Sequence, residues 1–275
     1  MPLSISIVAI LLGIVEGLTE FLPVSSTGHL IVFDRILGFQ SLLQNADKAE
    51  LFEVVIQLGA ILAIGVIYRK KLIASIFSKS LESSPGRLRT NLGIAFLPAA
   101  IFGFLTHKYI TEYLFSPITV GITLLVGGIA IIVIERSTNE DDRSITIDTM
   151  TWRDALVVGL AQVLSLIPGT SRSAATIMGG MLRGIKRSSA TDFSFMLAFP
   201  VMIAASLFEL AKYRDLLTSD VVGMVMIGFV TSFVVALAVV AWFIRYIQRH
   251  QFTGFGYYRI VFGTLVLILS ASHYL

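Results

Sequence analysis

Long apolar blocks follow one another along almost the whole of this 275-residue chain, and only short polar stretches separate them. Hydrophobic residues make up 55% of the sequence and charged residues 14%, which is far too apolar for a soluble domain of this length. Most blocks approach the roughly 20 residues that an α-helix needs to cross a bilayer. The sequence therefore predicts an all-α polytopic membrane protein.

Two of these blocks are broken at a proline. Pro23 splits the first into residues 3–22 and 24–38, and Pro168 splits the second, which reads L-S-L-I-P-G-T-S-R-S-A-A-T. Proline removes a backbone donor and disfavours helix at the residue before it. We therefore expect a pair of half-helices at each break.

The order of the blocks indicates two similar halves. A polar linker over residues 135–153 separates them, and in each half a broken pair is followed by three apolar segments. The predicted spans are 51–68, 91–106 and 118–134 in the first half, and 193–211, 221–244 and 257–275 in the second. We predict a single integral membrane domain, 1–275, with internal repeats at approximately 1–136 and 150–275.

A weak internal alignment agrees with this division. Gly13 aligns with Gly159 and Glu16 with Gln162. After a shift of one residue, the further matches are Pro23 with Pro168 and Ser25-Ser26 with Thr170-Ser171. If each broken pair is a re-entrant hairpin that returns to its own side, the three following spans invert the second half relative to the first, as in inverted-repeat transporters.

Basic residues predict the orientation, because cytoplasmic loops carry an excess of them. With re-entrant hairpins, the cytoplasmic loops would hold Arg69, Lys70, Lys71, Lys79, Arg87, Arg89, Arg136, Arg143, Arg153, Arg183, Lys186, Arg187, Arg245, Arg249 and Arg259. The external loops would keep Arg35, Lys48, Lys108, Lys212 and Arg214, and both termini would be external. A topology in which every apolar block crosses shares much of this pattern, so the hairpins rest on the proline breaks.

The first broken segment contains two carboxylates. Before Asp34 the only ionisable side chains are Glu16, Glu20 and His29. Residues four apart lie on the same face of a helix, so Glu16 and Glu20 would point into one space and repel each other. A hard divalent cation held by oxygen ligands relieves such repulsion. We therefore expect Glu16 and Glu20 to bind Mg²⁺ or Ca²⁺.

Hydroxyl residues follow Pro23 at the start of the second half-helix. Ser25, Ser26 and Thr27 would lie where free N–H groups and the positive end of the helix dipole favour phosphate. His29 lies one turn after Ser26, from which an imidazole could exchange a proton with the hydroxyl. The alternatives are a plain N-cap for the hydroxyls and a backbone hydrogen bond for His29.

Arg172 is the only charged side chain between Asp154 and Arg183. A guanidinium can bind phosphate oxygens in bidentate fashion, and Ser171, Ser173 and Thr176 add hydroxyls beside it. The alternative is an internal ion pair with Glu16 or Glu20. Glu53 and Gln57 are a further polar pair four residues apart, so Gln57 is a candidate substrate ligand, whereas Glu53 could equally lie at the helix end.

Several classes of protein are excluded. The absence of cysteine rules out disulfides, thiolate nucleophiles and Cys-ligated zinc. The net charge of +3 comes without any charged block that would indicate nucleic-acid binding. No Lys or Arg precedes Arg35, so the first apolar segment lacks the basic start of a signal peptide and is expected to remain in the mature protein.

Together these residues resemble a known family, the bacitracin-resistance type of undecaprenyl-diphosphate phosphatase. The resemblance covers essentially the whole chain and includes both hallmark motifs, E-G-L-T-E-F-L-P-V-S-S-T-G-H from Glu16 to His29 and P-G-T-S-R-S from Pro168 to Ser173. It implies hydrolysis of the C55 isoprenyl diphosphate lipid in cell-wall synthesis, bacitracin resistance, a divalent cation, and a site opening to the external or periplasmic side of the bacterial cytoplasmic (inner) membrane. It also implies that Glu16, Glu20, Ser26, His29 and Arg172 are functional.

Two functions follow from these residues. A phosphatase would use Ser26, His29, Glu20 and Arg172 in catalysis, with Ser26 favoured over His29 as nucleophile and a metal-bound water as the other alternative. Ser25, Thr27, Ser171, Ser173, Thr176 and Gln57 would bind substrate. A transporter would carry a phosphorylated lipid or anion through the same inverted repeats without chemistry. The oligomeric state stays open between a monomer and a homodimer.

Overall fold

The computed structural model describes residues 4–137, 139–216, 218–272 and 274–275, and almost all of them lie in helices. In order, the α-helices are α1 (Ile5–Thr19), α2 (Ser26–Leu37), α3 (Phe39–Leu43), α4 (Ala46–Ile67), α5 (Arg69–Ile76), α6 (Ser84–Tyr113), α7 (Pro117–Ser137), α8 (Trp152–Val163), α9 (Arg172–Leu182), α10 (Arg187–Lys212), α11 (Ser219–Tyr246) and α12 (Thr253–Ala271). Short 3-10 turns, η1 (Glu140–Asp142), η2 (Leu164–Leu166) and η3 (Arg214–Leu216), complete them. Within these residues there is no strand beyond one isolated bridge between Ile145 and Ile185, so the predicted all-α class is confirmed.

Six helices of the described part are long and apolar enough to cross a membrane, which confirms a multi-pass membrane protein. They are α4, α6, α7, α10, residues Val221–Tyr246 of α11, and α12. Each corresponds to one of the six predicted spans. Residue 3 of the first predicted segment and the N-terminus before it, residue 138 of the linker, and residue 273 of the last span lie outside the described residues.

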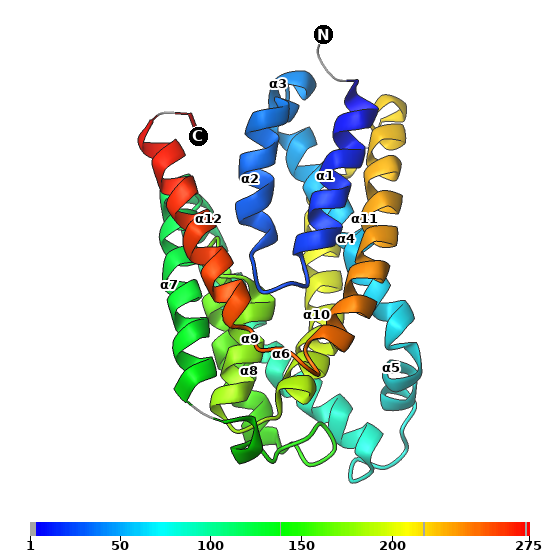
Figure 1. Cartoon of the computed structure of the whole chain (residues 1–275). Helices are drawn as coiled ribbons and strands as arrows, with labels where there is room; N and C mark the ends of the chain where they lie inside the picture. Colours follow the sequence, from blue (N-terminus) through cyan, green and yellow to red (C-terminus); the bar gives the residue numbers. More distant parts are fainter. Residues whose placement is uncertain (1–3, 138, 217, 273) are drawn as a thin grey trace.

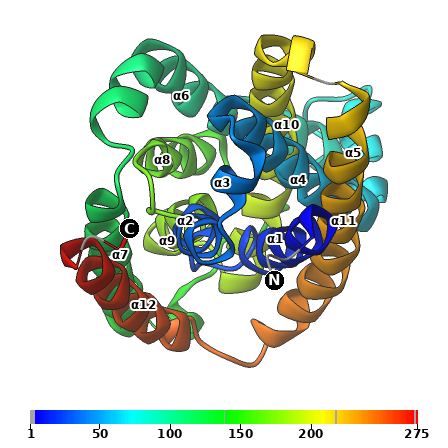
Figure 2. The same cartoon turned by 90° about the horizontal axis from the view of Figure 1, so that it is seen from above.

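The two broken segments form helical hairpins. Helices α1, α2, α8 and α9 have 15, 12, 12 and 11 residues, which is too short for a bilayer that needs about 20. In Figure 1, the α1–α2 hairpin extends into the helix bundle from the end that carries both termini, and the α8–α9 hairpin extends into it from the opposite end. Figure 2 shows α2 and α9 near the centre, with the longer helices around them.

The hairpin turns have the same backbone at corresponding positions. Ser25 and Ser171 both have positive φ angles, of 72° and 69°, and each side chain caps the helix that follows. Their spacing in sequence equals that between Glu16 and Gln162, so the one-residue shift predicted from the prolines is wrong. Pro23 and Pro168 both break helices, but they stand at different steps of the turn. The division of the whole chain into two inverted repeats stays a prediction.

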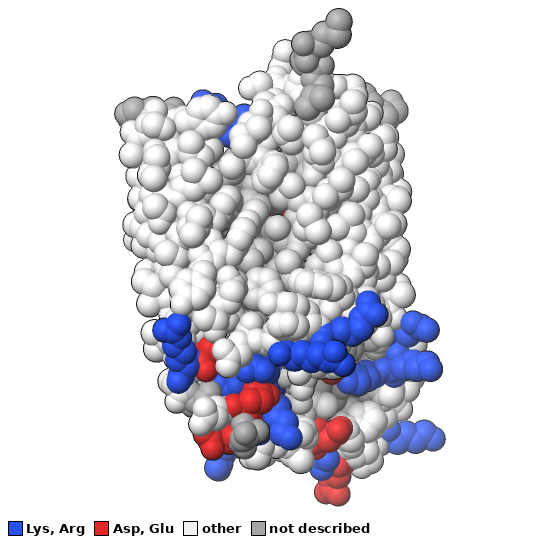
Figure 3. All heavy atoms as spheres, viewed as in Figure 1, with Lys and Arg blue, Asp and Glu red and all other residues white. Residues whose placement is uncertain are grey.

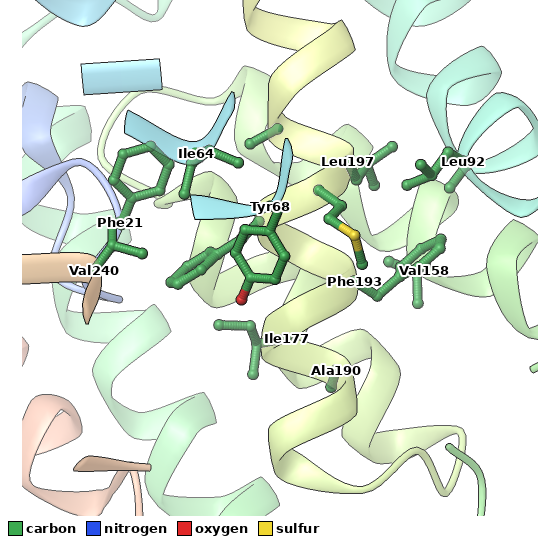
Figure 4. Close-up of a cluster of buried hydrophobic side chains, with 14 of the residues drawn as sticks. Phe21, Ile64, Tyr68, Leu92, Val158, Ile177, Ala190, Phe193, Leu197 and Val240 are labelled. Atoms are coloured by element: carbon green, nitrogen blue, oxygen red, sulfur yellow. The ribbon is translucent and has the colours of Figure 1, made fainter. Parts of the chain in front are cut away.

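Small residues let the helices approach closely. A Cβ added to Gly17 of α1 would meet the carbonyl oxygen of Ser232 in α11 at 2.7 Å, and one added to Gly128 of α7 would meet that of Gly256 in α12 at the same distance. Such contacts stabilise helix pairs in membranes, where lipid is as apolar as the side chains. A cluster of buried side chains that includes Phe21 of the first turn, Ile177, Phe193 and Val240 packs around α10 (Figure 4).

Charged side chains gather at one end of the molecule, and a broad uncharged surface lies above them (Figure 3). Part of the predicted basic loop is helical, because Arg69–Ile76 forms α5 and α6 begins at Ser84. Helix α6 therefore extends well beyond its predicted span of 91–106. The prediction that Arg259 lies in a cytoplasmic loop is also wrong, since Arg259 is part of α12 and is fully buried.

Candidate active site

A serine, a carboxylate and a guanidinium meet at the two hairpin turns. The Ser26 hydroxyl donates a hydrogen bond of 2.6 Å to Oε2 of Glu20, and Nη2 of Arg172 lies 3.5 Å from Oε1 of the same carboxylate. The Glu20 and Arg172 side chains are 6% and 10% exposed, so this pair is shielded from water. The ion pair of Arg172 with Glu20, which the sequence left as the alternative to phosphate binding, is therefore present.

The first turn places Glu20 and Ser26 face to face. Helix α1 ends at Thr19, the turn covers Glu20 to Val24, and α2 begins at Ser26. Ser25 connects them with φ of 72° and accepts a hydrogen bond from the N–H of Gly28. A positive φ costs a non-glycine residue on the order of 1–3 kcal/mol, and such residues concentrate at functional sites. The first N–H groups of α2 are thus presented beside the Ser26 hydroxyl.

The second turn places Arg172 and depends on Gly169. This glycine has φ of 87°, and a Cβ there would meet the Cα of Val120 in α7 at 2.8 Å. The Thr123 hydroxyl of α7 also donates to the Pro168 carbonyl at 2.7 Å. Glycine is needed for both the backbone angle and the close approach. The turn is therefore held against α7, and Arg172 begins α9 at a fixed place.

A cavity of about 650 Å³ has both Ser26 of this site and the C-terminal residue Leu275 in its lining. It therefore extends from the first turn toward the C-terminus, which lies at the same end of the molecule as the N-terminus in Figure 1. Ser26, Thr27, Glu16, Glu53 and Gln57 line its inner part. Its outer part is lined by polar and charged residues that include Asp34, Arg35, Gln40, Glu50, His107, Glu209, Lys212 and Tyr213. Ser26 is the only member of the serine, carboxylate and guanidinium group among the lining residues, so a ligand in the cavity meets its hydroxyl first.

Glu16 lines this cavity with a buried carboxylate that lacks hydrogen-bond partners within the described part of the chain. It is 1% exposed, and neither carboxylate oxygen has a hydrogen-bond partner. A buried carboxylate without a partner is costly, which makes it a natural ligand for a cation. Glu20 is differently placed, because its two oxygens already face Ser26 and Arg172. Among the described residues, no group of three His, Asp or Glu side chains is arranged to hold a metal ion, so a cation here would need ligands from elsewhere.

His29 lies apart from the Ser26 hydroxyl. Its Nδ1 is 2.7 Å from the Ser25 carbonyl oxygen and its Nε2 is 2.6 Å from the Tyr258 hydroxyl, so both ring nitrogens are engaged. The ring stacks on Phe262 and lines a separate, apolar cavity of about 500 Å³. The predicted pairing of His29 with the Ser26 hydroxyl is therefore absent here, and the hydrogen bond to a backbone carbonyl, which the sequence left as the alternative, is present.

The other predicted hydroxyl ligands lie at the turns or in the first turns of the helices that follow them. Ser25 and Ser171 are N-caps, and the Ser173 hydroxyl donates to the Leu22 carbonyl at 3.1 Å, which joins the second hairpin to the first. Thr176 is fully buried and its hydroxyl bonds to that of Ser194. These four side chains bond within the protein, whereas Thr27 and Gln57 line the cavity. Whether any of them binds substrate stays a prediction.

Two residues of α12 contribute to the site without any signal in the motifs. Tyr258 holds His29, and Arg259 contacts the backbone of both turns. Arg259 follows two tyrosines at the start of an apolar stretch, where an arginine is normally read as reaching to the membrane surface. Only its complete burial reveals the internal role.

Comparison with known proteins agrees with the resemblance seen in the motifs. The profile of the family described as "Bacitracin resistance protein BacA" matches residues 9–265. The chain is 51% identical to the undecaprenyl-diphosphatase of Nitrosomonas europaea, over 96% of this chain and 94% of that protein. It is 49% identical to undecaprenyl-diphosphatase 2 of Rhodospirillum rubrum, over 99% and 97% of the two chains.

The chain belongs to the BacA family. A more distant relative, the undecaprenyl-diphosphatase of Neisseria gonorrhoeae, is 43% identical over 99% of this chain and 98% of its own length. In this BacA family member, the two motifs that suggested the resemblance are the two hairpin turns, and they supply Glu20, Ser26 and Arg172.

Proposed function

We propose that this protein hydrolyses undecaprenyl diphosphate to undecaprenyl phosphate and inorganic phosphate. The observation that carries the proposal is the hydrogen bond from the Ser26 hydroxyl to Glu20, beside Arg172 and at the inner end of a polar cavity. A carrier of phosphorylated lipid needs phosphate ligands but no hydroxyl paired with a base. The names of relatives that match nearly the whole chain support the same substrate.

In the first step Ser26 is the nucleophile. As its Oγ forms a bond to the terminal phosphorus, Glu20 accepts the hydroxyl proton through Oε2. The bond from that phosphorus to the bridging oxygen breaks, and undecaprenyl phosphate leaves with the electron pair. Arg172 and the N–H groups at the start of α2 stabilise the charge that develops on the phosphoryl oxygens.

In the second step water hydrolyses the phosphoserine. The oxygen of water forms a bond to phosphorus, the bond to Ser26 Oγ breaks, and Glu20 returns its proton to that oxygen. Both protons of the water leave with the inorganic phosphate. The enzyme regains its starting state, and Glu20 acts first as base and then as acid.

A divalent cation, Mg²⁺ or Ca²⁺, fits the oxygen ligands of the cavity. Glu16, which has two unpartnered oxygens, would hold it, with Glu53 and Gln57 on the same wall and diphosphate oxygens as further ligands. When bound, such an ion neutralises part of the diphosphate charge. Glu53 would be the second protein ligand in place of the predicted Glu20, because the two Glu20 oxygens already contact Ser26 and Arg172.

The protein is proposed to work in the bacterial cytoplasmic membrane with its cavity open to the external side. The charged end in Figure 3 lies opposite the mouth of the cavity, and cytoplasmic ends carry the excess of Lys and Arg. The diphosphate would then be cleaved on the external side, where the carrier lipid is released.

Phosphate release by the purified protein in detergent tests this function. We expect hydrolysis of the isoprenyl diphosphate, loss of activity in a chelator, and recovery when Mg²⁺ or Ca²⁺ is restored. A matched reaction with the isoprenyl monophosphate controls for general phosphatase activity. If no phosphate is released with any metal, while the protein moves the lipid across vesicle membranes, the transporter reading replaces the enzyme.

Trapping of the intermediate tests the nucleophile. With diphosphate labelled in its terminal phosphate, we expect a phosphoenzyme that is stable in acid and labile in base, as for phosphoserine, and that is absent in Ser26→Ala. The opposite stability would assign the phosphoryl group to His29. Solvent oxygen-18 found in phosphate during a single turnover, with no trapped intermediate, would indicate a water nucleophile.

A further inference from the structure

Arg259 makes an unusual set of contacts in the centre of the protein. All five of its N–H groups donate to backbone carbonyl oxygens, and its side chain is completely buried. Nε donates to Leu124 at 3.4 Å, Nη1 to Pro23 at 3.3 Å and Thr170 at 3.0 Å, and Nη2 to Thr123 and Gly169 at 3.1 Å each. Among the described residues, no carboxylate lies within ion-pair distance of it.

The five acceptors belong to three different elements. Pro23 is in the first hairpin turn, Gly169 and Thr170 are in the second, and Leu124 and Thr123 are in α7. One side chain from α12 therefore joins both turns to the same helix. Chain breaks inside a membrane free backbone carbonyls that have no helical partner, and such groups need a donor from the protein. Arg259 supplies that donor to both breaks at once.

We propose that Arg259 is a positioning residue that holds the two hairpin turns in register and thereby sets the distances among Ser26, Glu20 and Arg172. The inference rests on the proposed hydrolysis for its effect on rate. Pro23 lies three residues before Ser26, and Thr170 lies two before Arg172. The hydrogen bonds from Arg259 to these two carbonyls, which we call the Arg259 clamp, therefore act on the backbone just before Ser26 and Arg172. Arg259 is not among the residues that line the cavity, so it acts through the backbone rather than on the substrate.

Arginine suits this position for reasons that lysine does not meet. The planar guanidinium has donors that point in five fixed directions, whereas an ammonium is a compact point charge with three. A lysine here would leave at least two of the five carbonyls without a donor. The positive charge of Arg259 lies behind the turns and has no carboxylate partner, so it also favours an anion at the site.

The first test is Arg259→Lys. We expect kcat for diphosphate hydrolysis to fall by about 10²-fold, because a displacement of about 1 Å among reacting groups costs roughly that much. KM should change less than kcat, since the cavity wall is intact. Arg143→Lys is the matched control, because Arg143 is also a buried arginine but pairs with Glu140 far from the turns. Equal kcat in Arg259→Lys and wild type would overturn the proposal.

The second test leaves the arginine in place. A Cβ added to Gly127 of α7 would press on the guanidinium, meeting its Cζ at 2.9 Å, and its three nearest neighbours would all be Arg259 atoms. Gly127→Ala should therefore displace Nη2 from the carbonyls of Thr123 and Gly169 without removing the charge. Gly93→Ala is the matched control, because a Cβ at Gly93 of α6 meets nothing within 4 Å. We expect lower kcat in Gly127→Ala alone.

Hydrogen exchange separates positioning from a general structural role. In Arg259→Lys we expect faster amide exchange in residues 20–29 and 168–176, with little change in α4 and α10. In Gly127→Ala the amide exchange of residues 168–176 should change more than that of residues 20–29, because Nη2 of Arg259 donates to the Gly169 carbonyl. Equally faster exchange throughout the protein would contradict the proposal and indicate loss of stability alone. If the wild type itself released no phosphate, the proposed function would fail while the exchange pattern still decided whether the clamp exists.

Discussion

The Glu20 carboxylate contacts both the Ser26 hydroxyl and the Arg172 guanidinium at the candidate site. Replacing it by glutamine keeps an oxygen that accepts hydrogen bonds but removes the base. We expect Glu20→Gln to fold and to lower kcat by roughly 10²–10⁴-fold, the usual contribution of a general base. Phosphate release and thermal unfolding measure the two effects, with Glu112→Gln on the exposed side of α6 as control. Near-normal turnover in Glu20→Gln would assign proton transfer to another group.

Glu16 has a different role because neither of its carboxylate oxygens has a hydrogen-bond partner among the described residues. Glu16→Gln should raise the Mg²⁺ concentration needed for half-maximal activity by about tenfold or more, as expected for loss of a charged ligand. The same change should leave the protein equally or more stable without metal, since it removes an unpartnered buried charge. Titration of phosphate release with Mg²⁺ and thermal unfolding in chelator check both effects. An unchanged metal dependence would place the cation elsewhere.

The residues of the site could be found from the sequence, but the pairing of Ser26 with Glu20 could not. The i,i+4 spacing of Glu16 and Glu20 and the isolation of Arg172 in an apolar stretch identified all three. Spacing along α2 also brought His29 within one turn of Ser26, yet Ser26 faces the polar cavity and His29 faces the apolar one. Glu20 reaches Ser26 only because the turn folds back, and turn geometry is not encoded in helical periodicity.

At the scale of the elements, the two turns share a serine with positive φ. At Ser171 the side chain caps α9, but its Cβ strains the backbone. Ser171→Gly removes a Cβ cost of roughly 1–2 kcal/mol and loses only a few tenths as a cap, whereas Ser171→Ala keeps the strain and loses about 1 kcal/mol of capping. We expect Ser171→Gly to be at least as thermally stable as the wild type, and Ser171→Ala to be less stable than both. A more stable Ala variant would mean that the cap and the φ angle are unimportant.

The breaks in the helices were predictable from proline, whereas the ends of the helices were not. Hydropathy detects only the part of a helix that lies in lipid, so α6 was predicted as 91–106 although Ser83 caps it at Ser84 and it continues to Tyr113. The close contact of Gly17 with α11 needs both helices to be placed first. Arg259 was predicted as a loop residue because its contacts with the two turns also depend on the placement of distant elements. Local chemistry was visible in the sequence, and contacts between distant elements were not.

At the scale of the whole molecule, the clamp bears on the choice between enzyme and carrier. Arg259 ties both turns to α7, and Ser173 donates to Leu22 across the same gap. Alternating access in inverted-repeat carriers moves one bundle against the other around a central site. Such a motion would separate these contacts in the middle of the membrane, where unpaired carbonyls are costly. The arrangement therefore favours a static site that performs chemistry.

The orientation of the whole molecule gives the last prediction. Ser80 lies between α5 and α6, and Ser137 ends α7 at the charged end, whereas Ser116 precedes α7 at the end that carries the cavity mouth. Because the excess of Lys and Arg marks the cytoplasmic side, single cysteines at Ser80 and Ser137 should react with an impermeant maleimide only after the cells are opened. A cysteine at Ser116 should react in intact cells whose outer barrier is permeable to the reagent. The natural chain has no cysteine, so it is its own unlabelled control. Labelling of Ser80 and Ser116 from the same side would refute the arrangement of hairpins and spans, whereas labelling of all three with the sides exchanged would turn the cavity toward the cytoplasm.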